Sequence, residues 1–476
     1  MLPAAACVHE RRRYSAFAEI FTKKPYIIGG GALFFFRIKQ TILNVVGRTY
    51  ESIDVQYYSN FIWRDVMKII DVHCHVFSED VLTFGGKLLI AFSDVITDLI
   101  DSGDYDHADN MIERINAFIE ISGKDPSDIA NALFDNYGDD SIIAPLMYDM
   151  YYLTHDQQHD IRDKVDQLMQ DYDAHNHPEK DRADTLRASL AGIGDKVKDD
   201  LVDEVLKDNS FEIQFQILKK LKNIENYRDR IYPFLSFDPR RSGNLDKIKA
   251  NVGPGKDFCG VKLYAPLGFS AAHPAMMDKR KGLYAYCVAN DIPVIAHCSS
   301  PGMPTMNDHL YVPHDSWVFD VRQGGLVALT MDKVVDFSLI DRDVKSQYFN
   351  HPEIWRIVLD EFPSLRLNLA HFGGDRKDWR EIIANMIKSN KYQNLYTDIS
   401  CHTDPDVLKY IRDEYDASDA VKRRLMYGSD FTISLLFADL LDHRNVIGNT
   451  FPLDQHQDVY CDNARRFLKL TPDKGA

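Results

Sequence analysis

The sequence predicts an α/β protein that folds as a (β/α)8 TIM barrel, and two observations support this fold class. Eight short apolar runs follow one another along the chain, most of them separated by segments with helical periodicity. Each run is continuously apolar, as expected for parallel strands that are covered on both faces, and eight is the number of strands in this barrel. The predicted strands cover residues 68–72, 141–147, 231–237, 259–264, 292–296, 365–370, 395–398 and 425–428.

The first predicted strand leads directly into the stretch Asp71-Val-His-Cys-His75. Side chains alternate between the two faces of a strand, so His73 and His75 point the same way. Neutral imidazoles are common ligands of zinc and similar metals, and this pair can bind one ion. An open, doubly wound sheet is the structural alternative, but no glycine-rich phosphate loop follows this first strand.

Two segments fall outside the barrel pattern. Residues 1–66 lack a clear pattern, and their longest apolar run, 26–36, is well short of the ~20 residues that cross a bilayer. Residues 155–210 are highly charged and helical in spacing. We therefore expect an N-terminal extension over 1–66 and a barrel domain over 67–470, with a helical insertion at about 155–210.

Composition narrows the class of protein. The chain has 476 residues, of which 45% are apolar, enough for a sizeable core. Its net charge of -16 argues against a nucleic-acid partner held through phosphate contacts. Seven cysteines without paired spacing are typical of reduced thiols in a cytoplasmic protein. We expect a small-molecule substrate and no membrane partner, and a homodimer is compatible with so large a barrel.

Polar residues close the predicted strands, at the end of a barrel where active sites lie. The fourth strand ends in Lys262 and Tyr264, the fifth in His297, the sixth in His371, the seventh in Asp398 and the eighth in Asp430. Polar groups in such positions must be satisfied by partners. Four histidines and a terminal aspartate, all at strand ends, therefore predict a divalent-metal site.

Loop residues supply further candidates. Arg240 follows the third strand, and either lines the pocket or makes hydrogen bonds within its loop. The long connection 299–347, between the fifth and sixth strands, has the length of an active-site lid. It carries Trp317, which we expect near the substrate. His402 follows the seventh strand, and we interpret it as a surface histidine.

Together these motifs resemble the amidohydrolase superfamily, and most of all the branch that includes aminocarboxymuconate-semialdehyde decarboxylase. The resemblance runs from about Lys68 to Leu468, and it includes the stretch His351-Pro-Glu-Ile-Trp before the sixth strand. It implies that four residues ligate a divalent metal, with zinc expected first and manganese or iron as alternatives. These residues are His73, His75, His297 and Asp430.

The resemblance also implies the catalytic roles. Asp430 would accept the proton of a metal-bound water, whose pKa the ion lowers to around 7, and His371 would lie beside this water. Lys262 has three interpretations. It is carbamylated and bridges two metals in some branches, its ammonium group could bind a substrate carboxylate, or it could pair with an acid such as Asp398.

The sequence thus predicts a metal-dependent hydrolase that uses a metal-activated water on a small polar substrate, with Lys262, Tyr264, Arg240 and Trp317 contacting that substrate. One alternative is a metal-dependent non-oxidative decarboxylase of a small carboxylic acid, because the same ligands serve both reactions. A second is a barrel that binds a ligand without turnover. The completeness of the predicted ligand set favours an enzyme.

Overall fold

Eight parallel strands form a closed barrel in the computed structural model. They are β1 (Ile70–Cys74), β2 (Ile142–Pro145), β3 (Phe234–Phe237), β4 (Gly260–Leu263), β5 (Val294–Ala296), β10 (Leu367–Leu369), β11 (Leu395–Asp398) and β12 (Leu425–Met426). One ladder runs β3-β4-β5-β10-β11-β12 and another joins β1 to β2. Bridges between Leu146 and Phe234 and between Ile143 and Ile231 link β2 to β3. A hydrogen bond from Val72 N to Tyr427 O closes the ring, so the predicted barrel is confirmed.

The structure describes residues 68–77, 102–138, 140–149, 151–154, 210–300, 302–305, 307–338, 342–436 and 438–470. The predicted extension over 1–66 and nearly all of the predicted insertion lie outside these residues. No described helix combines the length and the apolar character that crossing a membrane requires.

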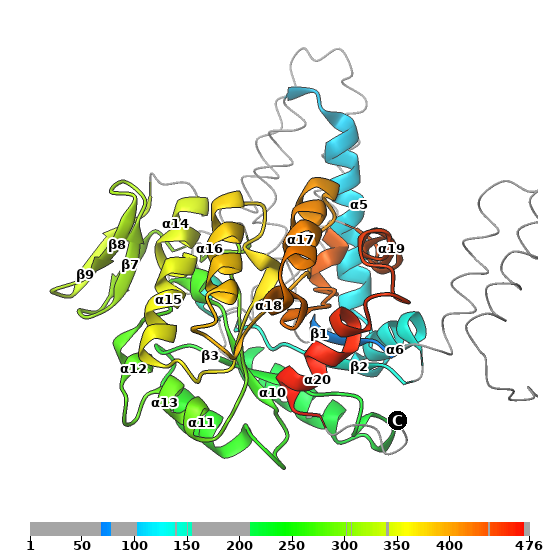
Figure 1. The fold of residues 1–476 in the computed structure, drawn as a ribbon, viewed down its shortest axis with the longest axis horizontal. Coiled ribbons are helices and arrows are strands. Elements are labelled where there is room, and N and C mark those ends of the chain that lie inside the picture. Colours follow the sequence, from blue (N-terminus) through cyan, green and yellow to red (C-terminus); the bar gives the residue numbers. More distant parts are fainter. Residues whose placement is uncertain are drawn as a thin grey trace, which may run out of the picture. The chain divides into compact units, whose positions relative to one another are not determined.

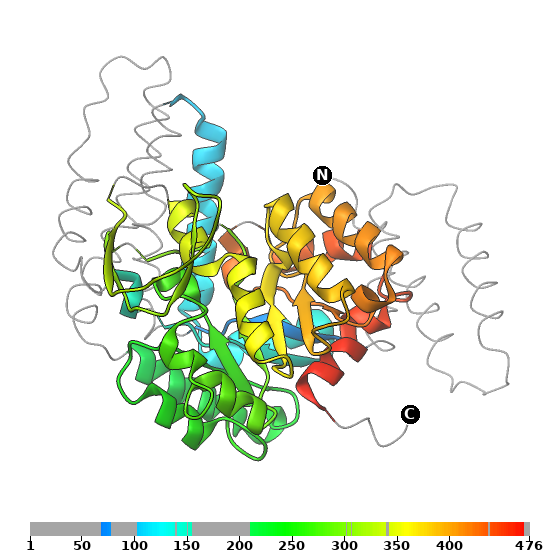
Figure 2. The ribbon, with the colours of Figure 1, turned by 60° about the vertical axis from the view of Figure 1, so that its left-hand side comes forward.

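Helices follow the strands and cover the outside of the barrel. They are α5 (Tyr105–Ser122), α6 (Pro126–Tyr137), α7 (Tyr151–Thr154), α10 (Ser210–Lys222), α11 (Asn244–Asn251), α12 (Pro274–Met277), α13 (Leu283–Ala289), α14 (Arg342–Asn350), α15 (Pro352–Glu361), α16 (Lys377–Lys388), α17 (Pro405–Ala417), α18 (Asp419–Lys422), α19 (Leu440–Thr450) and α20 (Asn463–Leu468). The yellow and orange helices after β10 and β11 pack beside one another in both views (Figure 1, Figure 2). One apolar cluster joins these helices to the strands.

A second apolar cluster lies around the N-terminal ends of the strands, where α20 packs against the barrel. Phe467 of α20 stacks on Phe234 at a ring-centroid distance of 6.4 Å, and it also contacts Tyr396. Apolar residues thus fill this end of the barrel. The polar side chains predicted for the metal site all gather at the opposite, C-terminal end.

The connection between β5 and β10, whose length is that of a lid, contains short strands that were not predicted from the sequence. It contains two antiparallel pairs, β6 (His309–Val312) with β9 (Lys333–Asp336) and β7 (Trp317–Asp320) with β8 (Gly325–Ala328). Each strand has only four residues, too few for a clear periodic signal. Burial nevertheless alternates along β6, where Leu310 and Val312 pack inward.

Candidate metal centre

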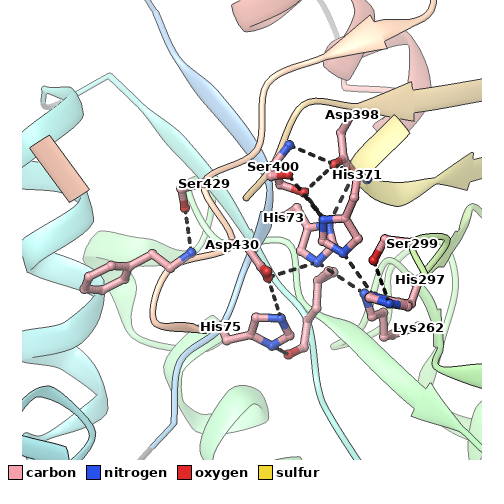
Figure 3. A network of polar contacts seen from close by, with 12 residues as sticks. His73, His75, Lys262, His297, Ser299, His371, Asp398, Ser400, Ser429 and Asp430 are labelled. Carbon is pink, nitrogen blue, oxygen red and sulfur yellow. Dashed lines mark hydrogen bonds and ion pairs between the residues drawn. The ribbon is translucent and has the colours of Figure 1, made fainter. Parts of the chain in front are cut away.

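Three ligand-type atoms converge at the C-terminal end of the barrel (Figure 3). The Nε2 atoms of His73 and His75 lie 3.2 and 3.1 Å from Oδ1 of Asp430. His73 and His75 come from β1 and its end, and Asp430 follows β12, the neighbouring strand of the ring. All three side chains are buried. The pairing of β1 with β2 shifts register between Asp71 and Cys74, and such bulges re-aim side chains beside active sites.

Neighbouring groups orient both histidines toward this point. Nδ1 of His75 lies 2.8 Å from the carbonyl oxygen of Leu146, an acceptor, so we assign the ring proton to Nδ1. Nδ1 of His73 lies 3.2 Å from Oδ2 of Asp398, which is also an acceptor, so we assign the ring proton of His73 to Nδ1 as well. In the neutral form of each ring, Nε2 then carries the electron pair that a metal ligand requires. Burial lowers the pKa of His75 to about 4, so its ring is neutral at pH 7.

The carboxylate of Asp430 shows whether these residues are suited to bind a cation. Its Oδ1 atom is buried, yet no described group hydrogen-bonds to it with acceptable geometry. A buried carboxylate oxygen without a donor is costly. A divalent cation among the three atoms would satisfy the oxygen and both nitrogens at once. Two imidazoles and a carboxylate are a donor set typical of zinc, so the residues present fit such an ion.

A second cluster, formed by His73, His371 and Asp398, also brings three ligand-type atoms together. Its carboxylate differs from that of Asp430, because five donors already occupy it. Burial alone would raise the pKa of Asp398, but His73, His371 and the hydrogen bond from Ser400 together hold it well below its usual range. We therefore place the candidate ion at Asp430.

His371 and His297 form a pair beside this centre. Nε2 of His371 lies 3.1 Å from Nδ1 of His297, and Nε2 of His297 lies 3.0 Å from Oγ of Ser299. Burial and the neighbouring His73 lower the pKa of His371 to about 3, and burial with His371 lowers that of His297 well below its ordinary value. Both rings are neutral at pH 7. His297 contacts His371 directly, but it does not join His73, His75 and Asp430 in one group of ligand atoms.

Left-handed backbone shapes the strand ends that carry these residues. The φ angles are 64° at His371, 67° at Cys401 and 58° at Asp430. Among residues other than glycine, aspartate and histidine are enriched in this region. Such conformations cost of order 1–3 kcal/mol each and cluster at functional sites. The chain thus turns sharply just past the strands and directs these side chains into the centre.

Asp71 joins the two strands that carry the converging ligands. Its carboxylate accepts hydrogen bonds from Ser429 Oγ at 2.6 Å, from Ser429 N at 3.1 Å and from the Tyr137 hydroxyl at 2.9 Å. Ser429 directly precedes Asp430, so Asp71 ties the loop after β12 to β1. Burial raises the pKa of Asp71 to about 6.

Lys262 lies at the centre with only 1% of its surface exposed. Its Nζ atom is 3.2 Å from Nε2 of His73, and no described carboxylate lies within ion-pair distance of it. The suggested pairing with Asp398 is therefore wrong, because the oxygens of that acid are taken by other donors. Burial lowers the pKa of Lys262 to about 8. Tyr264 lies next to it, with its ring 4.4 Å from that of His297 and its hydroxyl accepting from Met303 N at 2.8 Å.

We expect the Lys262→Met variant of the metal-free chain to be more stable than the wild type by about 3 kcal/mol at pH 7. The folded chain binds this proton less tightly than the unfolded chain, whose lysine has an ordinary pKa of 10.5, so folding disfavours the charged form below pH 8. The difference should shrink as the pH rises from 8 to 10.5. Urea denaturation at pH 7 and at pH 9.5 measures it, and an equal difference at both values would contradict a buried ammonium.

Arg240 and Trp317 are not brought to the centre. Arg240 donates to Asp238 at 2.9 and 2.6 Å and to the carbonyl of Leu267, beside a cavity of about 250 Å³ that His273 also lines. Trp317 lies in β7, where its carbonyl accepts from Ser270. No contact described by the structure joins either side chain to the histidines of the centre.

His402 is buried, so its interpretation as a surface histidine is wrong. Its Nε2 lies 2.6 Å from the carbonyl oxygen of His371 and supports the turn after β10. Ser299 and Ser400 contact the histidines of the centre as well, and neither serine was predicted from the sequence. The available signal was their position two residues beyond His297 and Asp398, which places them on the same face as those residues if the strand continues.

Comparison with known proteins assigns the family. The amidohydrolase family model matches residues 70–470. A metal-dependent hydrolase from Lactobacillus casei ATCC 334 is 13% identical, covering 86% of this chain and 96% of its own, with a TM-score of 0.37. A zinc-bound amidohydrolase from Burkholderia multivorans is 16% identical, covering 55% and 80%, with a TM-score of 0.34. No curated protein matches the chain.

The family model spans most of the chain and includes every strand of the barrel. It also includes His73, His75, Lys262, His297, His371 and Asp430. The chain therefore belongs to the amidohydrolase family, and it is a metal-dependent enzyme with a (β/α)8 barrel fold.

Proposed function

We propose that this protein hydrolyses a C–N or C–O bond at the activated carbonyl of a small polar substrate. The observation that carries the proposal is the convergence of two imidazole nitrogens on a buried carboxylate oxygen that lacks a hydrogen-bond donor. His73, His75 and Asp430 would hold the ion, and His297 would complete the set that the resemblance implies. When bound, a divalent ion supplies a nucleophile at neutral pH and polarises the carbonyl.

The chain's own residues divide the remaining work. Asp430 is buried and accepts the proton of the attacking water at its carboxylate. His371 is neutral and lies beside the centre, with its Nε2 atom 3.1 Å from Nδ1 of His297, and this Nε2 takes up a proton before it passes one to the leaving group. Lys262 and Tyr264 face the substrate.

The surroundings of Lys262 favour a substrate that carries a carboxylate. Lys262 is a buried amine without a described counter-ion, and a substrate carboxylate would supply one. This same observation favours a second candidate function, the metal-dependent decarboxylation of a small carboxylic acid. In that reaction the ammonium group would hold the carboxylate, and the centre would stabilise charge while the C–C bond breaks.

The metal content of the purified chain tests the arrangement at Lys262. We expect about one zinc, manganese or iron per chain by elemental mass spectrometry, with Lys262 unmodified in the intact mass. About two ions, together with a mass increase that corresponds to a carbamate, would instead make Lys262 a bridging ligand.

Turnover tests the reaction class. The zinc-loaded full-length chain would be incubated with small esters, lactones, amides and aromatic carboxylic acids, and both acid release and carbon dioxide release would be followed. Hydrolysis without carbon dioxide supports the first function, and carbon dioxide release supports the second. A chain that binds no metal even after incubation with metal salts would overturn both.

We also infer that the catalytic domain extends over residues 67–470. The described residues belong to one compact unit, Val66–Ala476, and the family match ends at 470. We also propose that residues 1–66 form an N-terminal extension and that residues at about 155–210 form a helical insertion in this domain. Removal of residues 1–66 should leave metal binding intact, which the same elemental analysis measures.

A further inference from the structure

We propose that Asp398 and Ser400 are positioning residues that orient two histidines with different tasks. Together they hold the ring protons of His73 and His371 on Nδ1, so that Nε2 of each ring is an acceptor, which faces Asp430 in His73 and His297 in His371. The inference rests on the proposed function, because one histidine serves as a metal ligand there and the other as a proton-transfer group. Figure 3 shows both residues on the side of the histidines away from Asp430.

The carboxylate of Asp398 can only accept hydrogen bonds. Its two oxygens face His371 N at 3.0 Å, Ser400 N at 3.2 Å, Ser400 Oγ at 2.5 Å, Asn368 Nδ2 at 2.6 Å and His73 Nδ1 at 3.2 Å. An ionised carboxylate offers about four lone-pair positions, so these five donors fill it. The side chain is also fully buried. His73 must therefore present an N–H group at Nδ1 to this acid.

Ser400 extends the same constraint to His371. The hydroxyl hydrogen of Ser400 points to Asp398, which leaves its oxygen only as an acceptor. Nδ1 of His371 lies 2.9 Å from this oxygen, and it lies 3.3 Å from the backbone carbonyl of Ser400. Both neighbours are acceptors, so the proton of His371 also lies on Nδ1.

One arrangement of protons then satisfies the whole chain of contacts. Nε2 of His371 is an acceptor, so the facing Nδ1 of His297 donates to it across 3.1 Å. Nε2 of His297 in turn accepts from the hydroxyl of Ser299 across 3.0 Å. The hydrogen bonds run in a single direction from Ser299 to Asp398. Asp398 is the fixed acceptor at the end of this series, and it determines every tautomer before it.

This shared dependence has a physical consequence. A buried acceptor of this kind holds the orientation and raises the basicity of a metal-bound histidine, and its loss typically costs 10–100-fold in metal affinity. Asp398 acts on His73 directly, whereas Ser400 lies 3.2 Å from His73 but closer to His371. Changes at the two positions should therefore have different effects.

The test combines zinc affinity with the histidine tautomers. Zinc affinity is measured on the full chain by competition with a chromogenic chelator. Tautomers are read from long-range 1H–15N spectra of the metal-free, 15N-histidine-labelled chain, with the His73→Gln and His371→Gln variants assigning the signals. In the wild type we expect Nδ1–H tautomers at both positions. An Nε2–H tautomer at either position would overturn the proposal without any further variant.

The variants separate the two residues. Asp398→Asn should weaken zinc binding ~10–100-fold, because the amide turns a donor toward one of the groups that the acid now accepts from. Ser400→Ala should weaken zinc binding less than Asp398→Asn does, and it should alter the tautomer signals of His371. Ser400→Thr keeps the hydroxyl and should restore those signals. Zinc affinity unaffected by Asp398→Asn, or His371 signals unaffected by Ser400→Ala, would each contradict the assigned role.

Ser141→Ala is the matched control for the serine variants. Ser141 is buried and donates its hydroxyl to the carbonyl of Gly138, but it lies at the start of β2. Its loss should change thermal stability without changing zinc affinity or the signals of His371. Failure of the proposed function is distinguishable from failure of this inference, because in the first case the wild type itself would not bind zinc.

Discussion

The Asp430→Asn variant should lose ~10²–10⁴-fold or more of the hydrolytic rate while it keeps its fold. An asparagine has the same shape as the aspartate, but it carries no charge to hold a cation and accepts no proton at pH 7. Both imidazole Nε2 atoms lie within 3.2 Å of the oxygen that this change alters. Turnover of the substrate found in the panel gives the rate, and zinc competition gives the affinity.

A suitable control is Asp439→Asn. Asp439 is a carboxylate of the same chain near the start of α19, where it pairs with Arg114 at the surface. We expect its rate to equal that of the wild type. Circular dichroism confirms the fold of both variants. If Asp430→Asn kept full activity, Asp430 would be removed from the mechanism.

Simultaneous replacement of His73 and His75 by alanine should reduce the metal content to background. The two histidines supply two of the three ligand atoms that converge on one point. No third imidazole among the described residues belongs to that group. Of the three converging residues their removal leaves only Asp430, and too few ligands remain to hold zinc tightly. Elemental mass spectrometry of protein purified without added metal measures the loss, and hydrolysis should disappear with the metal.

His351→Ala serves as the control for this variant. His351 is also buried, but it caps α15, where its Nδ1 atom accepts from Glu353 N. We expect this change to cost stability, typically ~1 kcal/mol for a lost cap, and to leave one metal ion bound. A full metal complement in the double variant at His73 and His75 would place the ion elsewhere in the protein.

The sequence by itself predicted the barrel and most of the residues that the structure gathers at the candidate metal centre. Continuous apolar runs specify buried strands through local chemistry, and a polar residue that ends such a run must lie at the strand's end. His73, His75, Lys262, His371 and Asp430 were all predicted in this way, and the structure brings them together. The two-residue period of a strand therefore carries information about the site as well as the fold.

Other features depended on contacts between residues far apart in the chain. Asp398 and Asp430 both follow predicted strands, but donors from several strands fill the carboxylate of Asp398 and leave Oδ1 of Asp430 open. Arg240 follows its strand as the site residues follow theirs, but Asp238 draws its guanidinium away.

The hydrogen-bond partners of a side chain are non-local, and His73 and Asp398 are separated by 325 positions along the chain. Ring protons, left-handed turns at strand ends and ion-pair partners are decided only when the strands assemble. The sequence therefore determines which chemical groups reach the end of the barrel. The tertiary structure decides which of these groups are free to bind a metal. A hydrogen-bond donor on another strand can take up the lone pairs of a side chain that the sequence alone marks as a possible ligand.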